Sequence, residues 1–205
     1  MKGVNRLGLF IATAVPFTLD AGVVITSPEV STTTPGTDSL PFLVGVPGGT
    51  GFTYTLNYSF GNGAKPQASA EGAATLSNDG AGALVKYSLG NTIDSTATWQ
   101  SAGNLYKPAT DTDPALGYFP PGTRGYLGLQ IPNGGGFNYG WADVSHNADS
   151  TLTLHRFAVE TDLNQPIAAG VVPEPSSAFA AALVAGSFAA FRARRRLMGR
   201  CADPN

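Results

Sequence analysis

Residues 52–60 read Phe-Thr-Tyr-Thr-Leu-Asn-Tyr-Ser-Phe, a stretch in which five large apolar residues alternate with four small polar ones. Successive side chains of a β-strand point to opposite faces, so this alternation predicts a strand with one buried face and one solvated face. Asn62-Gly63 follows directly, and both residues tolerate the positive φ of a tight reversal. The stretch therefore predicts a strand that ends in a turn.

Shorter stretches elsewhere repeat the same alternation. Residues 85–89 carry Val85, Tyr87 and Leu89 on one side, and residues 127–131 carry Leu127, Leu129 and Ile131 on one side. Each pattern predicts a further strand with one wet face.

A hairpin and a bulge are predicted in the second half of the chain. Asn133-Gly134-Gly135-Gly136 is typical of a turn, and the strand after it places Phe137, Tyr139 and Trp141 on one side. In residues 151–159, Leu152 and Leu154 lie on one face, whereas Phe157 and Val159 lie on the other. One extra residue in the strand would produce this switch, so a β-bulge is expected there.

Composition agrees with an all-β domain. The chain has 205 residues and 21.1 kDa, with 26 glycines and 15 prolines for chain reversals and only 13% charged residues. About 150 residues remain between the two terminal segments, which is one domain's worth. Seven or more short strands without an amphipathic helix favour an antiparallel β-sandwich, jelly-roll-like, over residues 22–170.

The body of the chain is acidic. Residues 22–173 hold five basic and eleven acidic residues, a net charge of −6. A nucleic-acid partner is not expected, because binding to phosphates needs a basic surface. Cys201 is the only cysteine, so no intrachain disulfide forms and the domain depends on its core.

The N-terminus reads as a secretion signal. Lys2 and Arg6 precede an apolar run from Leu7 to Phe17, and Pro16 lies near the end of that run. A charged segment followed by a short apolar helix is typical of a signal peptide. We expect residues 1–21 to be this signal, with export as the consequence.

Three segments follow one another at the C-terminus. Pro173-Glu174-Pro175 keeps the chain extended, because each proline ring fixes φ. An alanine-rich apolar stretch of 16 residues, 176–191, then predicts a short transmembrane helix, just below the usual spanning length. The arginine cluster after it would stay on the cytoplasmic side as a stop-transfer signal; its members are Arg192, Arg194, Arg195 and Arg196.

This ending resembles the PEP-CTERM sorting domain of bacterial exopolysaccharide-associated proteins, with the motif standing here as Val-Pro-Glu-Pro-Ser-Ser at residues 172–177. The resemblance implies that a membrane protease, an exosortase, recognises Pro173, Glu174 and Pro175 and processes the chain near them. Residues 171–198 would be the sorting and anchor segment and residues 199–205 a cytoplasmic tail. The protein would be anchored in the inner membrane during sorting and then reach the cell surface or the extracellular space.

Candidate catalytic residues are few. Asp143, Ser145, His146 and His155 lie close together in sequence, but they match neither a nucleophile elbow nor a zinc-binding His-x-x-x-His spacing. Asp143 and Ser145 would share a strand face only if the strand extends that far. We therefore expect no enzymatic activity and no cofactor.

Two kinds of binding site remain weak candidates. Asp111 and Asp113, together with Asp79, could offer oxygen ligands to calcium, but the loop lacks the remaining acidic positions of an EF-hand, so no metal site is assigned. Tyr126, Tyr139 and Trp141, with Tyr118 and Phe119, could form a platform on which sugar rings stack, although core packing is the commoner use of aromatic residues.

Two functional classes stay open. The first is a structural surface or matrix protein, associated with exopolysaccharide or biofilm and sorted by an exosortase. The second is a lectin-like carbohydrate-binding module that extracellular polysaccharide would engage, with or without calcium.

Overall fold

The computed structural model describes residues 22–32, 38–46, 48–59, 65–109 and 115–171. These residues form antiparallel β-sheets without a helix, and so contain no helix long and apolar enough to cross a membrane. The expectation of an all-β domain is confirmed. The expected signal helix at residues 1–21 and the expected C-terminal transmembrane helix lie outside the described residues.

The larger sheet has eight strands and is built around a long hairpin. Its main path runs in the order β1-β13-β12-β11-β6-β9, while β2 pairs with β13 and β7 pairs with β11. The strands are β1 (Val23–Thr26), β2 (Val30–Ser31), β6 (Thr75–Asn78), β7 (Lys86–Tyr87), β9 (Thr98–Gln100), β11 (Thr123–Asn133), β12 (Gly136–His146) and β13 (Leu152–Glu160).

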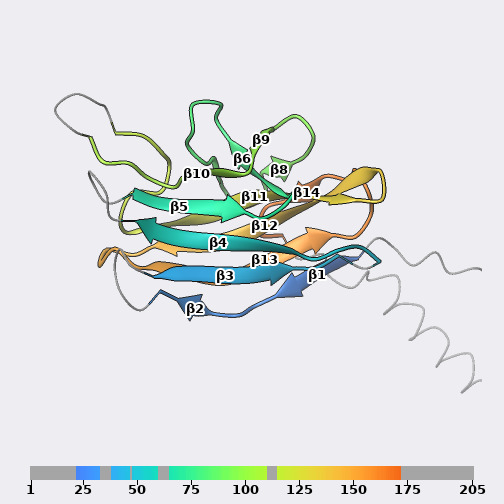
Figure 1. Ribbon diagram of the computed structural model, residues 1–205, viewed down its shortest axis with the longest axis horizontal. Coiled ribbons are helices and arrows are strands. Elements are labelled where there is room, and N and C mark those ends of the chain that lie inside the picture. Colours follow the sequence, from blue (N-terminus) through green and yellow to red (C-terminus); the bar gives the residue numbers. More distant parts are fainter. Residues whose placement is uncertain (1–21, 33–37, 47, 60–64, 110–114, 172–205) are drawn as a thin grey trace, which may run out of the picture.

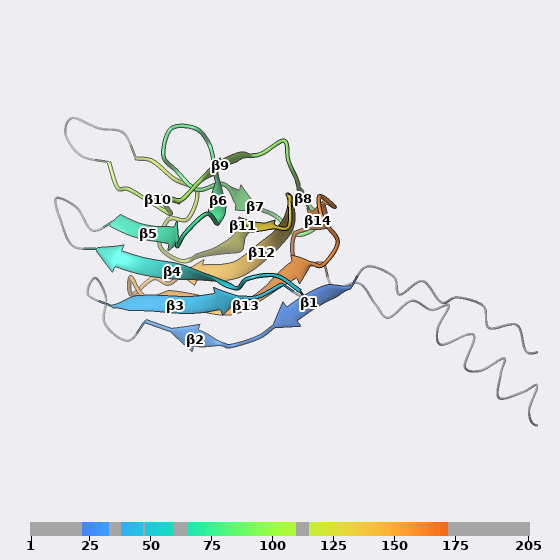
Figure 2. The ribbon, with the colours of Figure 1, turned by 45° about the vertical axis from the view of Figure 1, so that its right-hand side comes forward.

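The smaller sheet has four strands in the order β10-β5-β4-β3. Three of them follow one another in sequence and form a meander: β3 (Ser39–Val44), β4 (Phe52–Ser59) and β5 (Lys65–Ala70). The fourth is β10 (Ala102–Asn104). The sheet packs face to face with the larger one, as Figure 1 shows from one side and Figure 2 after a turn of 45°.

The main core lies between the two sheets. Inward side chains of the smaller sheet, such as Tyr54 and Leu56, meet those of the larger sheet, such as Leu127, Leu129 and Val144. These residues are buried because alternate positions of each strand point inward. The Tyr54 hydroxyl hydrogen-bonds the backbone oxygen of Gln130 at 3.1 Å, so its polar end is satisfied inside the core.

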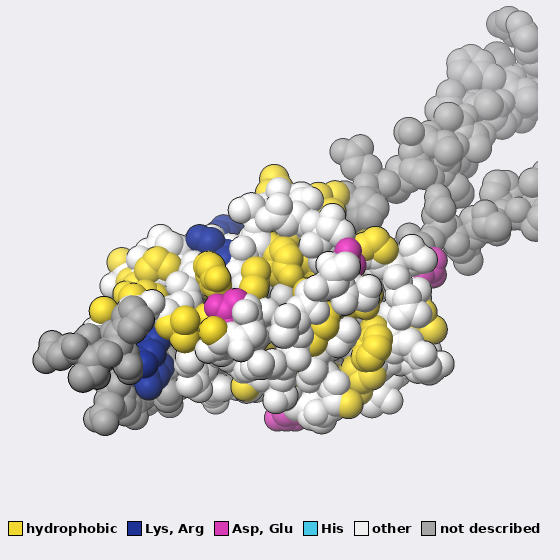
Figure 3. Space-filling view, turned by 90° about the horizontal axis from the view of Figure 1, so that it is seen from above, with side chains coloured by type: hydrophobic (Ala, Val, Ile, Leu, Met, Phe, Trp, Pro, Cys, Tyr) yellow, Lys and Arg dark blue, Asp and Glu magenta, His cyan; other side chains and the backbone are white. Residues whose placement is uncertain are grey.

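A second, smaller core lies on the opposite face of the larger sheet, which we call the outer face. Trp141 and Tyr139 are buried there against a two-stranded sheet made of β8 (Thr92–Ile93) and β14 (Ile167–Ala168). This cover explains why both faces of the central strands are apolar over part of their length. The face of the domain seen in Figure 3 carries few charged side chains.

Several predicted elements are confirmed. Strand β4 covers the decisive stretch, with Tyr54, Leu56 and Tyr58 buried. The predicted hairpin joins β11 to β12, with Gly134 and Gly135 at φ of 53° and 98° in its turn. The Asn62-Gly63 turn lies outside the described residues.

The predicted bulge is also present. The register of β13 against β12 shifts between Asp143 and Val144, whose partners are Arg156 and Leu154, so His155 has no partner in that ladder. The switch in apolar face that suggested the bulge therefore reflects one additional residue in β13.

Two expectations differ from the structure. The stretch 85–89 forms only the two-residue strand β7, and Leu89 is exposed. The jelly-roll-like connectivity is not the observed one, because the long strands form two meanders, β3-β4-β5 and β11-β12-β13, each within one sheet. Short hairpin turns keep consecutive strands adjacent and so favour this simpler order.

Truncating Leu129 should test the main core. Leu129→Ala removes a side chain that is 0% exposed, and we expect it to lower the free energy of unfolding by about 2–5 kcal/mol, because a cavity is left between the sheets. Leu43→Ala is the matched control, since Leu43 is 65% exposed on β3, and its effect should stay within about 0.5 kcal/mol. Urea denaturation of the purified full chain measures both values, and equal effects would contradict this packing.

Candidate functional site

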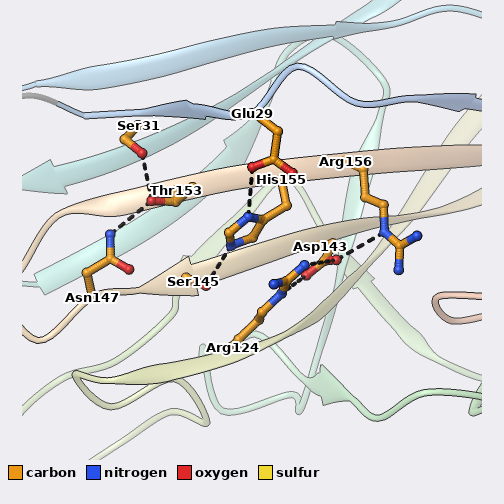
Figure 4. Close-up of polar contacts among 9 residues, drawn as sticks. All are labelled: Glu29, Ser31, Arg124, Asp143, Ser145, Asn147, Thr153, His155 and Arg156. Atoms are coloured by element: carbon orange, nitrogen blue, oxygen red, sulfur yellow. Dashed lines mark hydrogen bonds and ion pairs between the residues drawn. The ribbon is translucent and has the colours of Figure 1, made fainter.

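The uncovered part of the outer face carries a strip of polar side chains that crosses β11, β12 and β13. Figure 4 shows nine of its members: Glu29, Ser31, Arg124, Asp143, Ser145, Asn147, Thr153, His155 and Arg156. Strand β12 extends to His146, so Asp143 and Ser145 do share one face. We call these nine residues the polar strip.

Asp143 is the centre of the strip. Its side chain is only 1% exposed, and two arginines from the neighbouring strands bind it. Arg124 Nε and Nη2 donate to Oδ1 and Oδ2, each at 2.8 Å, and Arg156 Nε donates to Oδ2 at 3.2 Å. A buried carboxylate needs such partners, because an unpaired charge away from water costs several kcal/mol.

Electrostatics favour the ionised form of Asp143. Burial alone would raise its pKa, but the hydrogen bonds and charge of Arg124, together with the hydrogen bond of Arg156, outweigh burial and hold the pKa below its ordinary value. The hydrogen bond with Asp143 in turn raises the pKa of Arg124. One carboxylate therefore lies between two permanent cations, and the group as a whole keeps a net charge of +1.

Arg156 is held on its other side by aromatic rings. Its guanidinium carbon lies 5.4 Å from the centre of the Trp141 ring, and its Nη2 lies 3.5 Å from the Tyr126 hydroxyl. The Tyr126 ring meets the Trp141 ring edge to face at 5.4 Å. These cation–π and hydrogen-bond contacts fix Arg156 in place over the second core.

A second hydrogen-bonded chain links three strands of the same face. Ser145 Oγ lies 2.8 Å from His155 Nε2, and His155 Nδ1 lies 3.0 Å from Glu29 Oε2. The bulge makes this contact, because the additional residue His155 turns toward Ser145. Sequence analysis named Ser145 and His155 but not Glu29, which precedes β2 and approaches His155 only through strand pairing.

The order Ser–His–Glu is that of a hydrolase triad, yet other parts of such a site are missing. Ser145 lies within a central strand, whose N–H groups run along the sheet toward neighbouring strands and cannot stabilise an oxyanion above the face. Glu29 is 65% exposed, unlike the buried acid that orients a catalytic histidine. The hydrogen bonds from Ser145 through His155 to Glu29 instead join β12 and the segment before β2 to β13. The nearby contact of Ser31 Oγ with Thr153 Oγ1 at 2.7 Å joins β2 to β13.

His146 does not belong to this cluster. It points to the inner side of β12, where its Nδ1 lies 2.8 Å from the backbone oxygen of Phe119. Its Nε2 is buried without a hydrogen-bond partner among the described residues. Burial lowers the pKa of His146, although the contact with Phe119 acts in the opposite direction. His146 is therefore a neutral core residue.

The expected aromatic platform is corrected. Tyr139 and Trp141 are 2% and 0% exposed, because β8 and β14 and the arginine side chain cover them. Rings buried in this way pack the second core and offer no face to a sugar. Tyr126 alone of the three is partly exposed.

The remaining candidates are placed as follows. Asp79 caps its own turn by accepting hydrogen bonds from the N–H groups of Ala81 and Ala83. No group of three metal-ligating side chains occurs within the described ranges. Several candidates lie outside them: Asp111, Asp113, Pro173, Glu174, Pro175, Arg192, Arg194, Arg195 and Arg196.

Beside Arg124 the outer face forms an open hollow of about 350 Å³. Its lining comes from β7, the residues after it, β11 and Asp143 of β12; the members are Lys86, Tyr87, Ser88, Leu89, Arg124, Gly125, Tyr126 and Asp143. Gly125 is needed here, because a Cβ at this position would collide with the stem of Lys86. The sequence analysis did not predict Lys86, Arg124 and Arg156 as site residues. The one feature that could have pointed to them is that they are three of only five basic residues between residues 22 and 173.

Replacing Asp143 should destabilise the domain. Asp143→Asn leaves two guanidiniums without their shared carboxylate, and we expect a loss of about 1–3 kcal/mol in the free energy of unfolding at pH 7. Because the pKa of Asp143 is lower in the folded than in the unfolded chain, its ionised form contributes fully to the free energy of unfolding at pH values above the unfolded-state pKa of about 3.9. This contribution is lost as the pH falls through the folded-state pKa. The difference from the unmodified protein should thus shrink in acid. Asp162→Asn, an exposed carboxylate, is the control and should change little in denaturation at pH 7.

His146 should make stability fall in mild acid. Its folded-state pKa lies below the unfolded value of about 6.5, so below that pH the unfolded chain binds more protons and is stabilised relative to the folded chain. We expect the free energy of unfolding to decrease from pH 7.5 to 5, and to decrease less in His146→Gln. His155→Gln keeps His146 and should keep the steeper decrease. Equal slopes in all three proteins would refute the assignment.

No protein-family model, no curated protein and no solved structure matches this chain. The resemblance of residues 172–177 to the PEP-CTERM family accordingly rests on the residues quoted for it.

Proposed function

We propose that this chain is an exported surface protein that a membrane exosortase sorts and processes, and whose β-sandwich domain has a structural role in an exopolysaccharide matrix. One observation carries the proposal: Pro173-Glu174-Pro175, an apolar stretch and an arginine cluster follow one another directly after the folded domain. Each part suits one step, namely recognition by the protease, membrane insertion and arrest of transfer.

The arrangement of the domain is compatible with attachment by a terminal segment. β1 and β14, the first and last strands, lie at the same end of the sandwich in both ribbon views (Figures 1 and 2). A protein held through its C-terminal segment would therefore direct this end toward the membrane and the opposite end away from it.

A structural role is favoured over catalysis by the polar strip. The chain from Ser145 through His155 to Glu29 has the connectivity of a triad, but the flat strand around Ser145 offers no donors for an oxyanion. The hydrogen bonds of the strip instead join neighbouring strands. The inferred partners are the exosortase, the membrane during sorting, and extracellular polysaccharide.

A lectin-like module is the second candidate, and the hollow beside Arg124 favours it. A sugar-binding site at this hollow would not involve Tyr139 and Trp141, which are buried. Calcium assistance would depend on Asp111 and Asp113, outside the described residues, and is not needed at the hollow.

Intact mass tests the sorting proposal. The protein recovered from the surface or medium of its native host should end near residues 172–176, whereas the protein from a host without the membrane protease should retain residues 192–205. Replacing Pro173, Glu174 and Pro175 by alanine should also preserve the tail, since the recognition element is removed. Glu71→Ala, an exposed change within the domain, is the control and should be processed normally.

The opposite result is equally clear. If the protein keeps residues 192–205 in both hosts, the ending is a permanent anchor and the exosortase is not its partner. If the alanine variant is still cut at the same place, Pro173, Glu174 and Pro175 are not the recognition element.

A further inference from the structure

Positive charge is concentrated around the hollow, on an otherwise acidic domain. The body of the chain carries a net charge of −6, yet Lys86, Arg124 and Arg156, three of its five basic residues, lie at or beside the hollow. Asp143 is the only carboxylate in the lining, and both arginines bind it. Glu29 lies farther along the strip and binds His155. The electrostatic potential at the hollow is consequently expected to be positive and to attract anions.

Arg124 is held in an orientation that leaves donors free for a second carboxylate. Asp143 occupies its Nε–H and one Nη2–H, which fixes the plane of the guanidinium. The remaining Nη2–H and the two Nη1–H groups have no partner among the described residues, and the side chain is 54% exposed. The end of a guanidinium formed by Nη1 and Nη2 presents two parallel donors that match the two oxygens of a carboxylate.

Lys86 also lines the hollow. It pairs with Leu127 of β11, and its stem lies over Gly125, where the absence of a Cβ makes room for it, so the stem runs along the side of β11 that faces the main core. Within the described part of the chain it has no ion pair. Tyr87, Ser88, Leu89 and Tyr126 complete the lining. The lining thus combines two cations with hydroxyl groups and with the apolar surface of Leu89 and the tyrosine rings.

We propose that this hollow binds the carboxylate of a uronic-acid residue in an acidic polysaccharide, with Arg124 as a bidentate donor and Lys86 as a second cation. The choice of a glycan rests on the proposed function, which places the domain in a polysaccharide matrix. It agrees with the open shape, which lets a long chain lie across the face, and with a lining that offers hydroxyl groups beside tyrosine rings, a combination that suits the polar and apolar faces of a sugar ring. Asp143 is a positioning residue, because it holds the Arg124 guanidinium. Arg156 acts through Asp143, which it also binds, and leaves the group with a net positive charge.

Binding of oligogalacturonate to the purified full chain tests the proposal by calorimetry. We expect Lys86→Gln to weaken binding by about tenfold or more, the change that loss of one charge-assisted hydrogen bond produces. Arg124→Lys keeps the charge but removes the bidentate geometry, and it should weaken binding as well. Lys107→Gln removes the same charge outside the lining and is the matched control, with unchanged affinity expected. Thermal melts of each variant establish that it is folded.

Three ligands complete the experiment. The methyl ester of the same oligomer and a neutral dextran should not bind, because the carboxylates are blocked or absent, and binding of the acid should weaken as salt is added. Polyglutamate of equal charge should compete poorly; equal competition would mean that the hollow recognises carboxylates on any polymer, which would overturn the glycan assignment. No binding of oligogalacturonate, or binding unchanged in Lys86→Gln, would overturn the site. Either failure is separate from the mass experiment, which tests sorting alone.

Discussion

The pairing of β11 with β12 is the interaction on which the rest of the structure depends. Eleven residues of each strand pair without interruption from Thr123 and His146 to the turn at Asn133 and Gly136. Because the side chains alternate, this one hairpin supplies apolar residues to the main core on its inner face and to the second core on its outer face. The other strands of the larger sheet attach to its two sides, and the smaller sheet packs on its inner face.

The outer face changes character along the same two strands. Toward the turn it carries Tyr139 and Trp141 beneath β8 and β14, and toward the other end it carries the polar residues Asp143 and Ser145 with their partners. Arg156 joins the two regions, since its guanidinium lies against the Trp141 ring and also binds Asp143. The Trp141 ring thus fixes the position of Arg156, and Arg156 in turn helps to fix the buried carboxylate of Asp143. Because Asp143 also binds Arg124, the position of Arg124 beside the hollow depends on the same contacts.

Local patterns predicted what depends on neighbours in sequence. The alternation in β4 and β11, the glycine turn and the bulge at His155 are all readable from a few consecutive residues. Strand order was not predictable, because β1 pairs with β13 from the opposite end of the domain, and no local signal marks such a partner. The site was only partly predictable for the same reason: Asp143 and Ser145 share a strand, whereas Arg124, Arg156 and Glu29 reach them through register. The burial of Tyr139 and Trp141 likewise depends on β8 and β14, which come from distant parts of the chain, so the sequence left both core packing and a sugar platform open for them.

The attachment of the last strand determines how the domain would respond to tension. β14 is held by two residue pairs with β8 and by the hydrogen bonds between Ala169 and residues 90 and 91. Gly170 follows, in contact with the ring of Tyr126. A force applied along the chain at Val171 would load these few contacts before any strand of the main sandwich. The two-stranded sheet of β8 and β14 would therefore separate first. Its release would uncover Trp141 and remove the contact of Gly170 with Tyr126, a residue that lines the hollow, while the two large sheets stayed closed. Load on the tail would in this way reach the surface beside Arg124.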